Sequence, residues 1–308
     1  IGTLGKAMPD RLVGDLKGAS NITAIGGPHL NRGDDFLFVE FPAGGTGAFS
    51  GGDGNNTVRN FAEGDISSIQ PVESIELTCP LRVESTSLRT NSGGAGKWRG
   101  GLGLTRKLRL LAPHGRLSVL SDRNIIPPYG VRGGKNSAPN RFTVQRNKKV
   151  IQPSELPGKV SAFALREGDI VVEETAGGGG YGDPLERDPL LAARDAAFDY
   201  VSESAVLATY GVVMQNGKVD EQATATARSH IANDRVHLTL QNLQGIVDSE
   251  FDGSRRIAIV SSPTAKQLHA THDTLIEIPN PDGPSLRAWL RIDDAVRAGN
   301  CAISSSAL

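Results

Sequence analysis

The sequence predicts an α+β fold that is predominantly antiparallel β, with a short helical segment and a small C-terminal β-containing module. Short apolar runs recur at close spacing, each bounded by Gly, Pro or Asn, as is typical of antiparallel strands joined by turns. Glycine accounts for 37 of the 308 residues, well above the usual share of about 7 %. An uninterrupted helical pattern begins only after Asp188.

The N-terminal part is expected to contain few regular elements. Residues 1–33 are predicted to be irregular, because seven glycines interrupt any helical period. The first predicted strand covers 34–41, where a continuous apolar run suits a strand buried on both faces. A glycine-dense loop follows over 43–54. Residues 73–89 alternate well enough for a strand or a bent pair of strands, with Pro80 at a bulge or an edge.

The middle of the chain carries the clearest strand patterns. In 102–110, leucines at four positions share one parity, and Arg106 alone interrupts the alternation. Four further short strands are predicted at 117–120, 142–145, 160–165 and 169–174.

Helices are predicted late in the sequence. Asp188 is an N-cap candidate with Pro189 at the first helical position, and the helix is expected to run to Tyr200. Ser202 caps a second predicted helix, which Gly211 ends. Residues 221–244 are expected to continue the helical character.

The C-terminal module returns to strand patterns. Strands are predicted at 256–260, 275–278 and 287–292, and the Asn-Pro-Asp-Gly turn at 280–283 favours a hairpin between the last two. We place a domain boundary near residue 220, which gives a first region of 1–220 and a small module of 221–308.

Charge and cysteine content exclude several classes of protein. Lys and Arg number 33 against 34 Asp and Glu, so nothing indicates a nucleic-acid or anionic-membrane partner. Cys79 and Cys301 lie far apart, which argues against a disulfide framework or a structural zinc site. No apolar run approaches a membrane span, so a cytoplasmic location is predicted. Because the chain starts at Ile1, we expect a piece of something longer.

Familiar catalytic and nucleotide-binding motifs are absent. The run from Gly93 to Lys97 is not a phosphate-binding loop, because Asn91 stands where the first glycine is needed and Trp98 where Ser or Thr is needed. There is no dinucleotide fingerprint or nucleophile elbow. His269 and His272 would offer two imidazoles to a metal if helical, but no third ligand is evident.

Acidic residues near the glycine-rich loops are better candidates for a site. Asp53 lies between glycines, Asn60 follows, and Glu73 and Glu76 come shortly afterwards. Such loops bring backbone amides and carboxylates close to a ligand. The alternative is an ordinary Asp-Gly turn at Asp53 and solvated or structural glutamates. The four glycines at 177–180 form either an anion-binding nest or a place where backbones approach closely.

Several of these segments together resemble the hydantoinase B/oxoprolinase family. Residues 91–103 (NSGGAGKWRGGLG) are similar to the family's Asp-Ser-Gly-Gly-Ala-Gly-x-x-Arg-Gly-Gly-x-Gly signature, with Asn91 in place of the usual Asp. Residues 177–189 (GGGGYGDPLERDP) are similar to its second hallmark. Further matches in order are 44–48, Asp53-Gly54, Asn60, 71–76 and 210–213. The resemblance covers roughly 1–215.

The resemblance has implications for partners and cofactors. Family members are nearly twice as long, which implies that this chain is the C-terminal part of a B-type subunit. The family's metal ligands lie in the N-terminal half, so a divalent metal is expected there and none on this chain alone. ATP and magnesium are expected on an A-type partner subunit, within a hetero-oligomer that also includes the N-terminal half.

The resemblance implies ATP-dependent chemistry on an unreactive carbonyl compound. The first hypothesis is hydrolysis of a cyclic amide, a hydantoin or lactam, through a phosphorylated intermediate. The alternatives are a subunit of a ketone carboxylase of the acetone or acetophenone type, and a non-catalytic scaffold for the ATP-binding subunit. No catalytic residue is assigned. Five residues are candidates to position substrate or the phosphoryl group: Asp53, Asn60, Glu73, Glu76 and Arg99. Arg99 offers either a forked donor or an ion pair that holds the glycine-rich turn.

Overall fold

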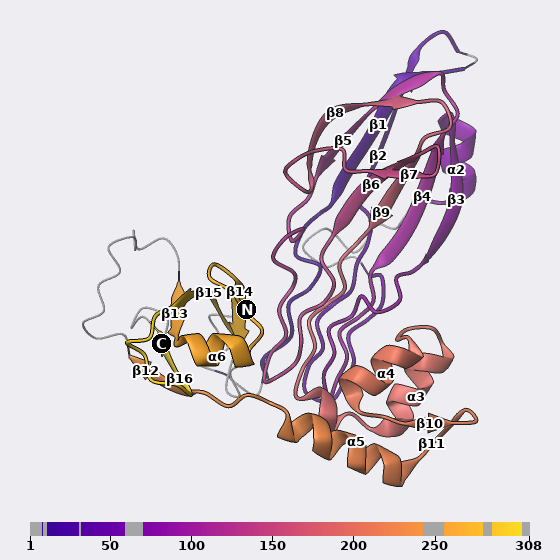
Figure 1. Cartoon of the computed structure of the whole chain (residues 1–308). Helices are drawn as coiled ribbons and strands as arrows, with labels where there is room; N and C mark the ends of the chain where they lie inside the picture. The colour runs from indigo at the N-terminus through magenta and orange to yellow at the C-terminus, as the bar shows by residue number, and fades with distance from the viewer. Residues whose placement is uncertain are drawn as a thin grey trace.

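The computed structural model describes Met8 and residues 11–30, 32–58, 70–242, 256–279 and 285–303. A sandwich of two sheets forms one end of the molecule, and helices form the other (Figure 1). Long extended segments connect these two ends. The C-terminal module lies beside the extended segments. The predicted fold class, mostly antiparallel β with few helices, is confirmed.

The sandwich contains nine strands and one short helix among the described residues. Their bounds are β1 (Ile22–Pro28), β2 (Asp35–Glu40), α2 (Val72–Thr78), β3 (Leu81–Leu88), β4 (Leu104–Leu110), β5 (His114–Leu120), β6 (Arg141–Arg146), β7 (Lys149–Ile151), β8 (Lys159–Arg166) and β9 (Ile170–Glu174).

The rest of the described chain contains shorter elements. They are η3 (Pro184–Glu186), α3 (Pro189–Ala197), α4 (Glu203–Tyr210), β10 (Met214–Gln215), β11 (Lys218–Val219), α5 (Glu221–Asn233), β12 (Thr239–Asn242), β13 (Ile257–Val260), α6 (Ser262–Gln267), β14 (Leu275–Ile278), β15 (Leu286–Ile292) and β16 (Asn300–Ile303).

Two antiparallel sheets face each other in the sandwich, with strand orders β2-β1-β5-β8 and β3-β4-β9-β6-β7. Alternate residues of each strand point into one shared core, which explains the alternation in the sequence. The core includes Ile25 and Phe38 from one sheet and Leu108 and Phe142 from the other, all nearly fully buried. The strands predicted between 102 and 174 are confirmed.

The prediction of irregular structure for 1–33 was wrong, because β1 lies there and pairs with both β2 and β5. Glycine in this strand permits close packing instead of breaking it. A Cβ atom at Gly27 would lie 2.7 Å from the carbonyl oxygen of His114, on the neighbouring strand β5.

The prediction of strand structure from Glu73 was also wrong, since residues 72–78 form helix α2 and only 81–88 form a strand. Within α2, Ile75 is buried while Leu77 is 79 % exposed. The two residues share parity in the sequence but not a face of the structure. A seven-residue helix is too short for its 3.6-residue period to be distinguished from alternation.

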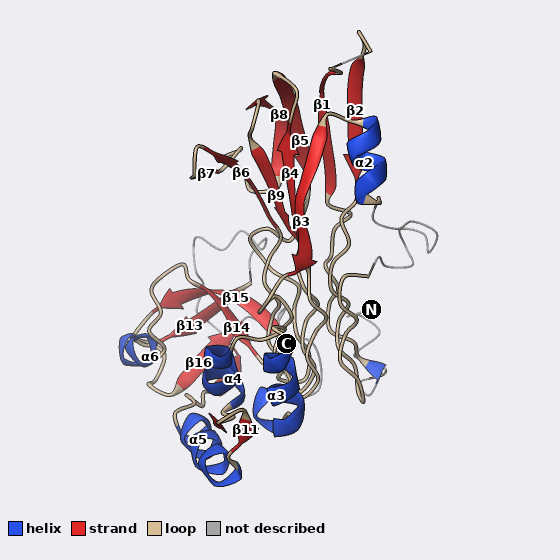
Figure 2. Ribbon diagram, turned by 90° about the vertical axis from the view of Figure 1, so that its right-hand side faces the viewer, coloured by secondary structure: helices blue, strands red, loops and turns tan. Residues whose placement is uncertain are grey.

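Four glycine-rich segments run side by side between the sandwich and the helices (Figures 1 and 2). We call segments 42–54, 92–103, 128–137 and 175–183 the glycine bundle. Backbone hydrogen bonds link them directly: the Gly178 amide donates to the Gly101 carbonyl (2.9 Å), and the Gly101 amide donates to the Thr46 carbonyl (2.9 Å). A Cβ atom at Gly178 would lie 1.8 Å from the Thr46 oxygen. The bundle therefore requires glycine for close backbone approach.

The helices at the far end begin and end largely where the sequence predicts. The Asp188 side chain accepts the Leu190 amide (2.8 Å), and α3 ends at Ala197, before the predicted Tyr200. The Ser202 hydroxyl accepts the Ala205 amide (3.3 Å), and Gly211, with a φ of 61°, ends α4.

Helix α5 ends at Asn233, so the expected helical character up to 244 holds only in its first half. Strand β12 follows and pairs in parallel with β16, Thr239 lying opposite Asn300. This pairing joins residues distant in the sequence, and it overrides the local preference for helix.

The C-terminal module has its own sheet, of order β12-β16-β13-β15-β14, and its own core. The three predicted strands are present, and β14 and β15 are antiparallel, Leu275 lying opposite Trp289. The turn predicted at 280–283 lies outside the described residues. Helix α6, which the sequence analysis did not predict, packs Ala265 into the module's core.

Candidate functional site

Asp53 and Arg99, two of the predicted site residues, meet where the glycine bundle reaches the helices. The Arg99 backbone amide donates to Asp53 Oδ1 (2.7 Å). The Arg99 guanidinium extends to helix α3, where its Nε donates to Asp195 Oδ2 (3.2 Å). Its Nη1 donates to the carbonyl oxygen of Gly100 (2.6 Å). Asp53 and Arg99 therefore link two bundle segments to a helix.

Arg187 completes this arrangement, which we call the ion-pair cluster: Asp53, Arg99, Arg187 and Asp195. Arg187 Nη1 and Nη2 each lie 2.8 Å from one Asp53 carboxylate oxygen, so the pair is bidentate. Arg187 Nη2 also lies 2.7 Å from Asp195 Oδ2. The side chains of Arg187 and Asp195 are fully buried, and that of Arg99 is 3 % exposed.

The cluster balances two cations against two anions. Burial would raise the pKa of Asp53, but the hydrogen bonds and charge of Arg187 outweigh it, so this pKa lies below its usual value. Burial would lower the pKa of Arg187, but Asp53 and Asp195 raise it above its usual value. Aromatic rings add contacts: the Arg99 guanidinium carbon lies 5.3 Å from the Tyr200 ring centre, and that of Arg187 lies 5.8 Å from that of Tyr210.

This geometry bears on the two interpretations of Arg99. Its Nε and Nη1 donors are directed at protein acceptors, and its side chain is almost fully buried. The arrangement favours an ion pair that holds the glycine-rich turn over a forked donor for a substrate anion. The sequence analysis missed Arg187 and Asp195. The signals for them were an arginine next to the N-cap of α3 and an acidic residue within its otherwise apolar stretch.

The structure does not bring the other predicted site residues to this cluster. Glu73 and Glu76 are exposed on α2, which packs against β3 of the sandwich. Glu76 Oε1 accepts the backbone amide of Val83 (2.9 Å), so it ties α2 to the start of β3. Asn60 lies outside the described residues.

A cavity of about 530 Å³ lies beside the cluster, between the bundle and helices α4 and α5. Its polar lining is largely bonded within the protein. Asn91 Nδ2 donates to the Ser202 hydroxyl (3.1 Å), and Arg235 forms a bidentate pair with Asp183 (2.5 and 2.8 Å). Exposed Lys135 adds a positive charge. The cavity adjoins the most charged part of the fold.

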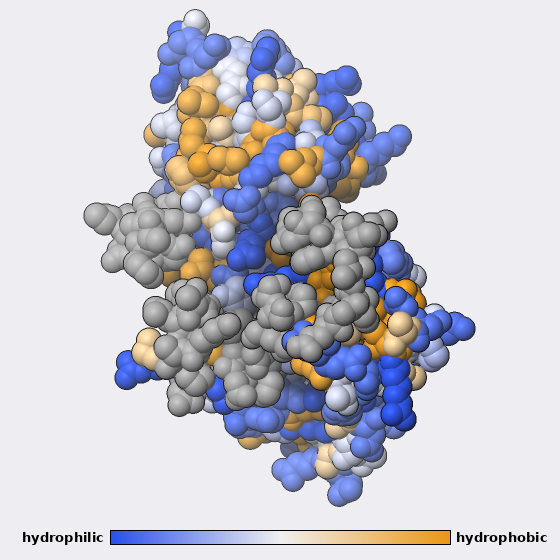
Figure 3. Space-filling view, turned by 90° about the vertical axis from the view of Figure 1, so that its left-hand side faces the viewer, coloured by the Kyte–Doolittle hydropathy of each residue, from blue (hydrophilic) through white to orange (hydrophobic). Residues whose placement is uncertain are grey.

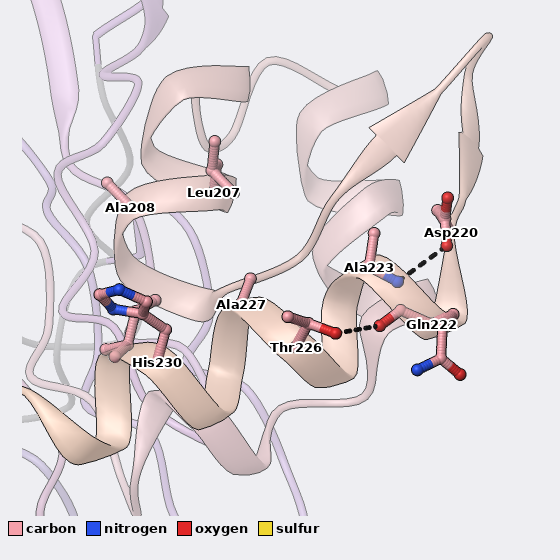
Figure 4. A pocket seen from close by; sticks show the side chains of 9 residues that line it. Leu207, Ala208, Asp220, Gln222, Ala223, Thr226, Ala227 and His230 are labelled. Atoms are coloured by element: carbon pink, nitrogen blue, oxygen red, sulfur yellow. Dashed lines mark hydrogen bonds between the residues drawn. The ribbon is translucent and has the colours of Figure 1, made fainter.

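A second, more apolar hollow of about 680 Å³ lies between α4 and α5 (Figure 4). Leu207 and Ala208 of α4 and Ala223 and Ala227 of α5 form much of its wall. Asp220, which lies at its edge, is already used to cap α5, because its Oδ1 accepts the Ala223 amide (2.9 Å). This hollow therefore resembles a packing groove more than a catalytic centre.

A buried charge cluster of a different kind lies between the sheets of the sandwich. Arg106 Nη1 donates to Glu40 Oε2 (2.7 Å), and Nη2 donates to the backbone oxygen of Gln70 (2.9 Å). Burial raises the pKa of the neighbouring Glu173 well above its usual value, and the charge of Glu40 raises it further. The arginine that interrupts the leucine pattern of β4 is thus the counter-ion of a buried carboxylate.

Within the described part of the chain, no three His, Cys, Asp or Glu residues form a group that could hold a metal ion. His272 Nε2 lies 3.0 Å from Arg291 Nη1, and the same guanidinium forms an ion pair with Asp273. Since these residues do not fit a metal site, we derive no metal-dependent step from them.

The sequence of the bundle and the sandwich matches a known protein family. The family model described as hydantoinase B/oxoprolinase matches residues 1–184, and the chain belongs to this family. The match includes Asp53 and Arg99 and ends just before Arg187. The resemblance identified from residues 91–103 and 177–189 is therefore confirmed.

Curated relatives are considerably longer than this chain. An uncharacterized protein from Methanocaldococcus jannaschii is 38 % identical over 204 residues, which is 66 % of this chain and 34 % of that protein. A putative D-/L-hydantoinase subunit of the B type, from Pseudomonas sp., is 28 % identical over 212 residues, covering 68 % of this chain and 35 % of that protein. The chain spans about a third of the length of these relatives.

Two solved structures share the fold. The ATP-dependent caprolactamase from Pseudomonas jessenii matches with a TM-score of 0.66 and 29 % identity, covering 73 % of this chain and 40 % of that one. Nucleotide-free acetone carboxylase, an enzyme of ATP-dependent acetone carboxylation, matches with a TM-score of 0.61 and 26 % identity, covering 70 % and 33 %.

Proposed function

We propose that this chain is part of a heteromeric ATP-dependent enzyme that hydrolyses a cyclic amide, a hydantoin or lactam, through a phosphorylated intermediate. The observation that carries the proposal is membership of the hydantoinase B/oxoprolinase family over 1–184. The likeness to a B-type hydantoinase subunit and to caprolactamase adds support, since both names refer to cyclic amides.

The chemistry gives a reason for the use of ATP. The oxygen of a resonance-stabilised amide is a poor leaving group until it carries a phosphoryl group. We propose that an A-type partner subunit binds ATP and magnesium. For the portion of the B-type subunit that relatives have in addition to the residues found here, we propose a divalent metal. The location remains a prediction, the cytoplasm; in the described part of the chain, no helix is long and apolar enough to cross a membrane.

We propose that the ion-pair cluster supports the site by fixing the bundle segments of Asp53 and Arg99 against α3. In this arrangement the two residues position substrate or phosphoryl group through the loops that they hold. Asn60, Glu73 and Glu76 stay predictions as further positioning residues. No residue of this chain is assigned a catalytic role.

The decisive experiment uses the reconstituted complex of this chain with its A-type and remaining B-type partners. We expect ATP- and magnesium-dependent opening of a hydantoin or lactam ring, followed by chromatography of the product. The same complex is then given a ketone and labelled bicarbonate. Label in an acid-stable product would overturn the hydrolase proposal in favour of a ketone carboxylase, which the likeness to acetone carboxylase supports.

A non-catalytic scaffold is the third candidate, supported by the neutral, internally bonded ion-pair cluster. In this case Asp53→Ala leaves turnover unchanged, while Gly178→Val, which clashes with the Thr46 carbonyl, abolishes assembly. Loss of turnover in Asp53→Ala, with assembly intact by size-exclusion chromatography, would exclude a pure scaffold.

A further inference from the structure

The outer face of the sheet β2-β1-β5-β8 is unusually apolar for an exposed surface. Its inner face packs into the sandwich core, whereas outward residues remain open. The exposed fractions are 70 % for Leu37, 42 % for Val39 and 56 % for Leu120. Antiparallel sheets that face water normally place polar residues on that side, so this face has the character of a surface that another polypeptide covers.

Strand register makes the apolar residues neighbours. Val39 of β2 lies opposite Ala24 of β1, and Ile22 of β1 lies opposite Leu120 of β5. A hollow of about 310 Å³ opens between β1, β5 and β8, lined by Ile22, Ala24, Leu120 and Val160 among others. Figure 3 shows apolar residues gathered on the sandwich, on a face that no undescribed segment covers in this view.

The sheet also has an open edge at β2. Within the described residues β2 pairs with β1 alone, and it is the terminal strand of this sheet. Neither charged blocking residues nor proline occur at its outward positions 37 and 39. An apolar edge strand of this kind is available for pairing with a further strand or for cover by another segment.

The length of the relatives indicates what covers this face. The caprolactamase chain contains the same fold within a polypeptide of which this chain covers 40 %, and the hydantoinase relative is covered to 35 %. All of the face residues lie in the part that matches the family, between 22 and 160. The remaining family sequence therefore has to pack against this matched region, and the outer sheet face is its broadest apolar surface.

We propose that the outer face of β2-β1-β5-β8 is the docking surface for the rest of the B-type subunit, a polypeptide that presents an apolar surface to Leu37, Val39 and Leu120. The inference rests on the proposed function, because it takes the B-type subunit as the assembly. It assigns the contact to the sandwich and leaves the ion-pair cluster and its cavity free at the opposite end of the bundle.

The test measures binding between this full-length chain and the polypeptide of the same organism that carries the remaining family sequence. Leu37→Lys and Leu120→Lys are compared with Leu190→Lys, a matched control because Leu190 is also 70 % exposed but lies on α3. Each buried leucine contributes enough that we expect Kd to rise about tenfold or more in the sheet variants. The control is expected to bind like wild type. Circular dichroism establishes that all variants are folded.

Two outcomes would overturn the proposal. In one, the sheet variants bind the companion polypeptide with unchanged Kd, or the Leu190 control weakens binding equally. In the other, analytical ultracentrifugation shows that the chain alone forms a dimer that Leu37→Lys dissociates, which makes a second copy the occupant.

Failure of the docking surface is distinguishable from failure of the proposed function. If the sheet variants lose binding but the wild-type complex opens no cyclic amide, the function fails and the docking surface stands. If the complex hydrolyses a hydantoin or lactam and the sheet variants assemble normally, the docking surface alone is wrong.

Discussion

At the scale of single residues, the informative positions are charged side chains in apolar surroundings. Arg187 has no exposed surface and holds carboxylates from two distant segments, Asp53 and Asp195. Such a group is costly to bury and is stable only with its partners in place. Removing one member leaves the opposite charges unpaired in the interior.

We therefore expect Arg187→Ala to lower the free energy of unfolding by about 3–5 kcal/mol, measured by urea denaturation. Lys97→Ala provides a control in the same region, because the Lys97–Glu186 pair (3.4 Å) is largely exposed. That control is expected to cost about 1 kcal/mol or less. Equal losses in the two variants would mean that the cluster is not a structural lock.

Glu173 leads to a prediction about pH. Its pKa is raised by burial, so in the folded state it keeps its proton above its usual value of 4.5. Its contribution to stability is full below that value and falls as pH rises, by about 1.4 kcal/mol per pH unit, until the folded-state pKa is passed. Glu173→Gln, which stays neutral, is expected to flatten this fall between pH 5 and 8 in thermal denaturation. A slope like that of wild type would contradict the assignment.

At the scale of elements, the glycine bundle is the unusual structure. It is neither helix nor sheet, and its segments contact one another through backbone groups. Side chains have no room at these crossings, as the short Cβ distance at Gly178 shows. The unusual glycine content of the chain is largely explained by this element.

Gly178→Ala is expected to lower the melting temperature sharply, with a destabilisation of about 4 kcal/mol or more, because the backbone of 46–47 cannot move aside. Gly26→Ala is the matched control in strand β1, where the new Cβ would have its nearest neighbour at 3.4 Å. Differential scanning calorimetry should show a shift of a few degrees at most for the control. The bundle argument fails if both alanines are tolerated alike.

At the scale of the whole molecule, the chain divides between the bundle-linked helices and the C-terminal module. The boundary predicted near 220 stays a prediction, but contacts favour one after Arg235. Arg228 of α5 bonds to the carbonyl oxygens of Tyr210 (3.0 Å) and Arg187 (2.5 Å), and Arg235 pairs with Asp183. The module's own core comprises residues between 238 and 303.

We expect a chain that ends at Val236 to keep the sandwich, bundle and helices folded. The lost contacts are few, chiefly those of Arg287 and Glu277 with Asn136, where Arg287 Nη2 donates to Asn136 Oδ1 (2.8 Å). Calorimetry should show the main transition within a few degrees of the full chain, with the module's transition gone. Global unfolding of the shortened chain would place the boundary elsewhere.

Local patterns in the sequence predicted most of the fold. Alternation located the strands between 102 and 174, and Asp188, Ser202 and Gly211 located helix ends, because these signals involve residues adjacent in the chain. Helix α2 was missed because seven residues hold too little periodicity, and β1 was missed because its glycines were read as breaks. Of the predicted site residues, Asp53 and Arg99 do come together.

The sequence by itself determined the family, through ordered glycine motifs, and most of the secondary structure, through short-range periodicity and capping. Only the tertiary structure decided which charges meet, since Arg187 and Asp53 are 134 residues apart. It also decided that the glycines serve close backbone packing rather than phosphate binding. The physical reason is that burial and ion pairing depend on chain segments brought together by folding, which no local pattern records.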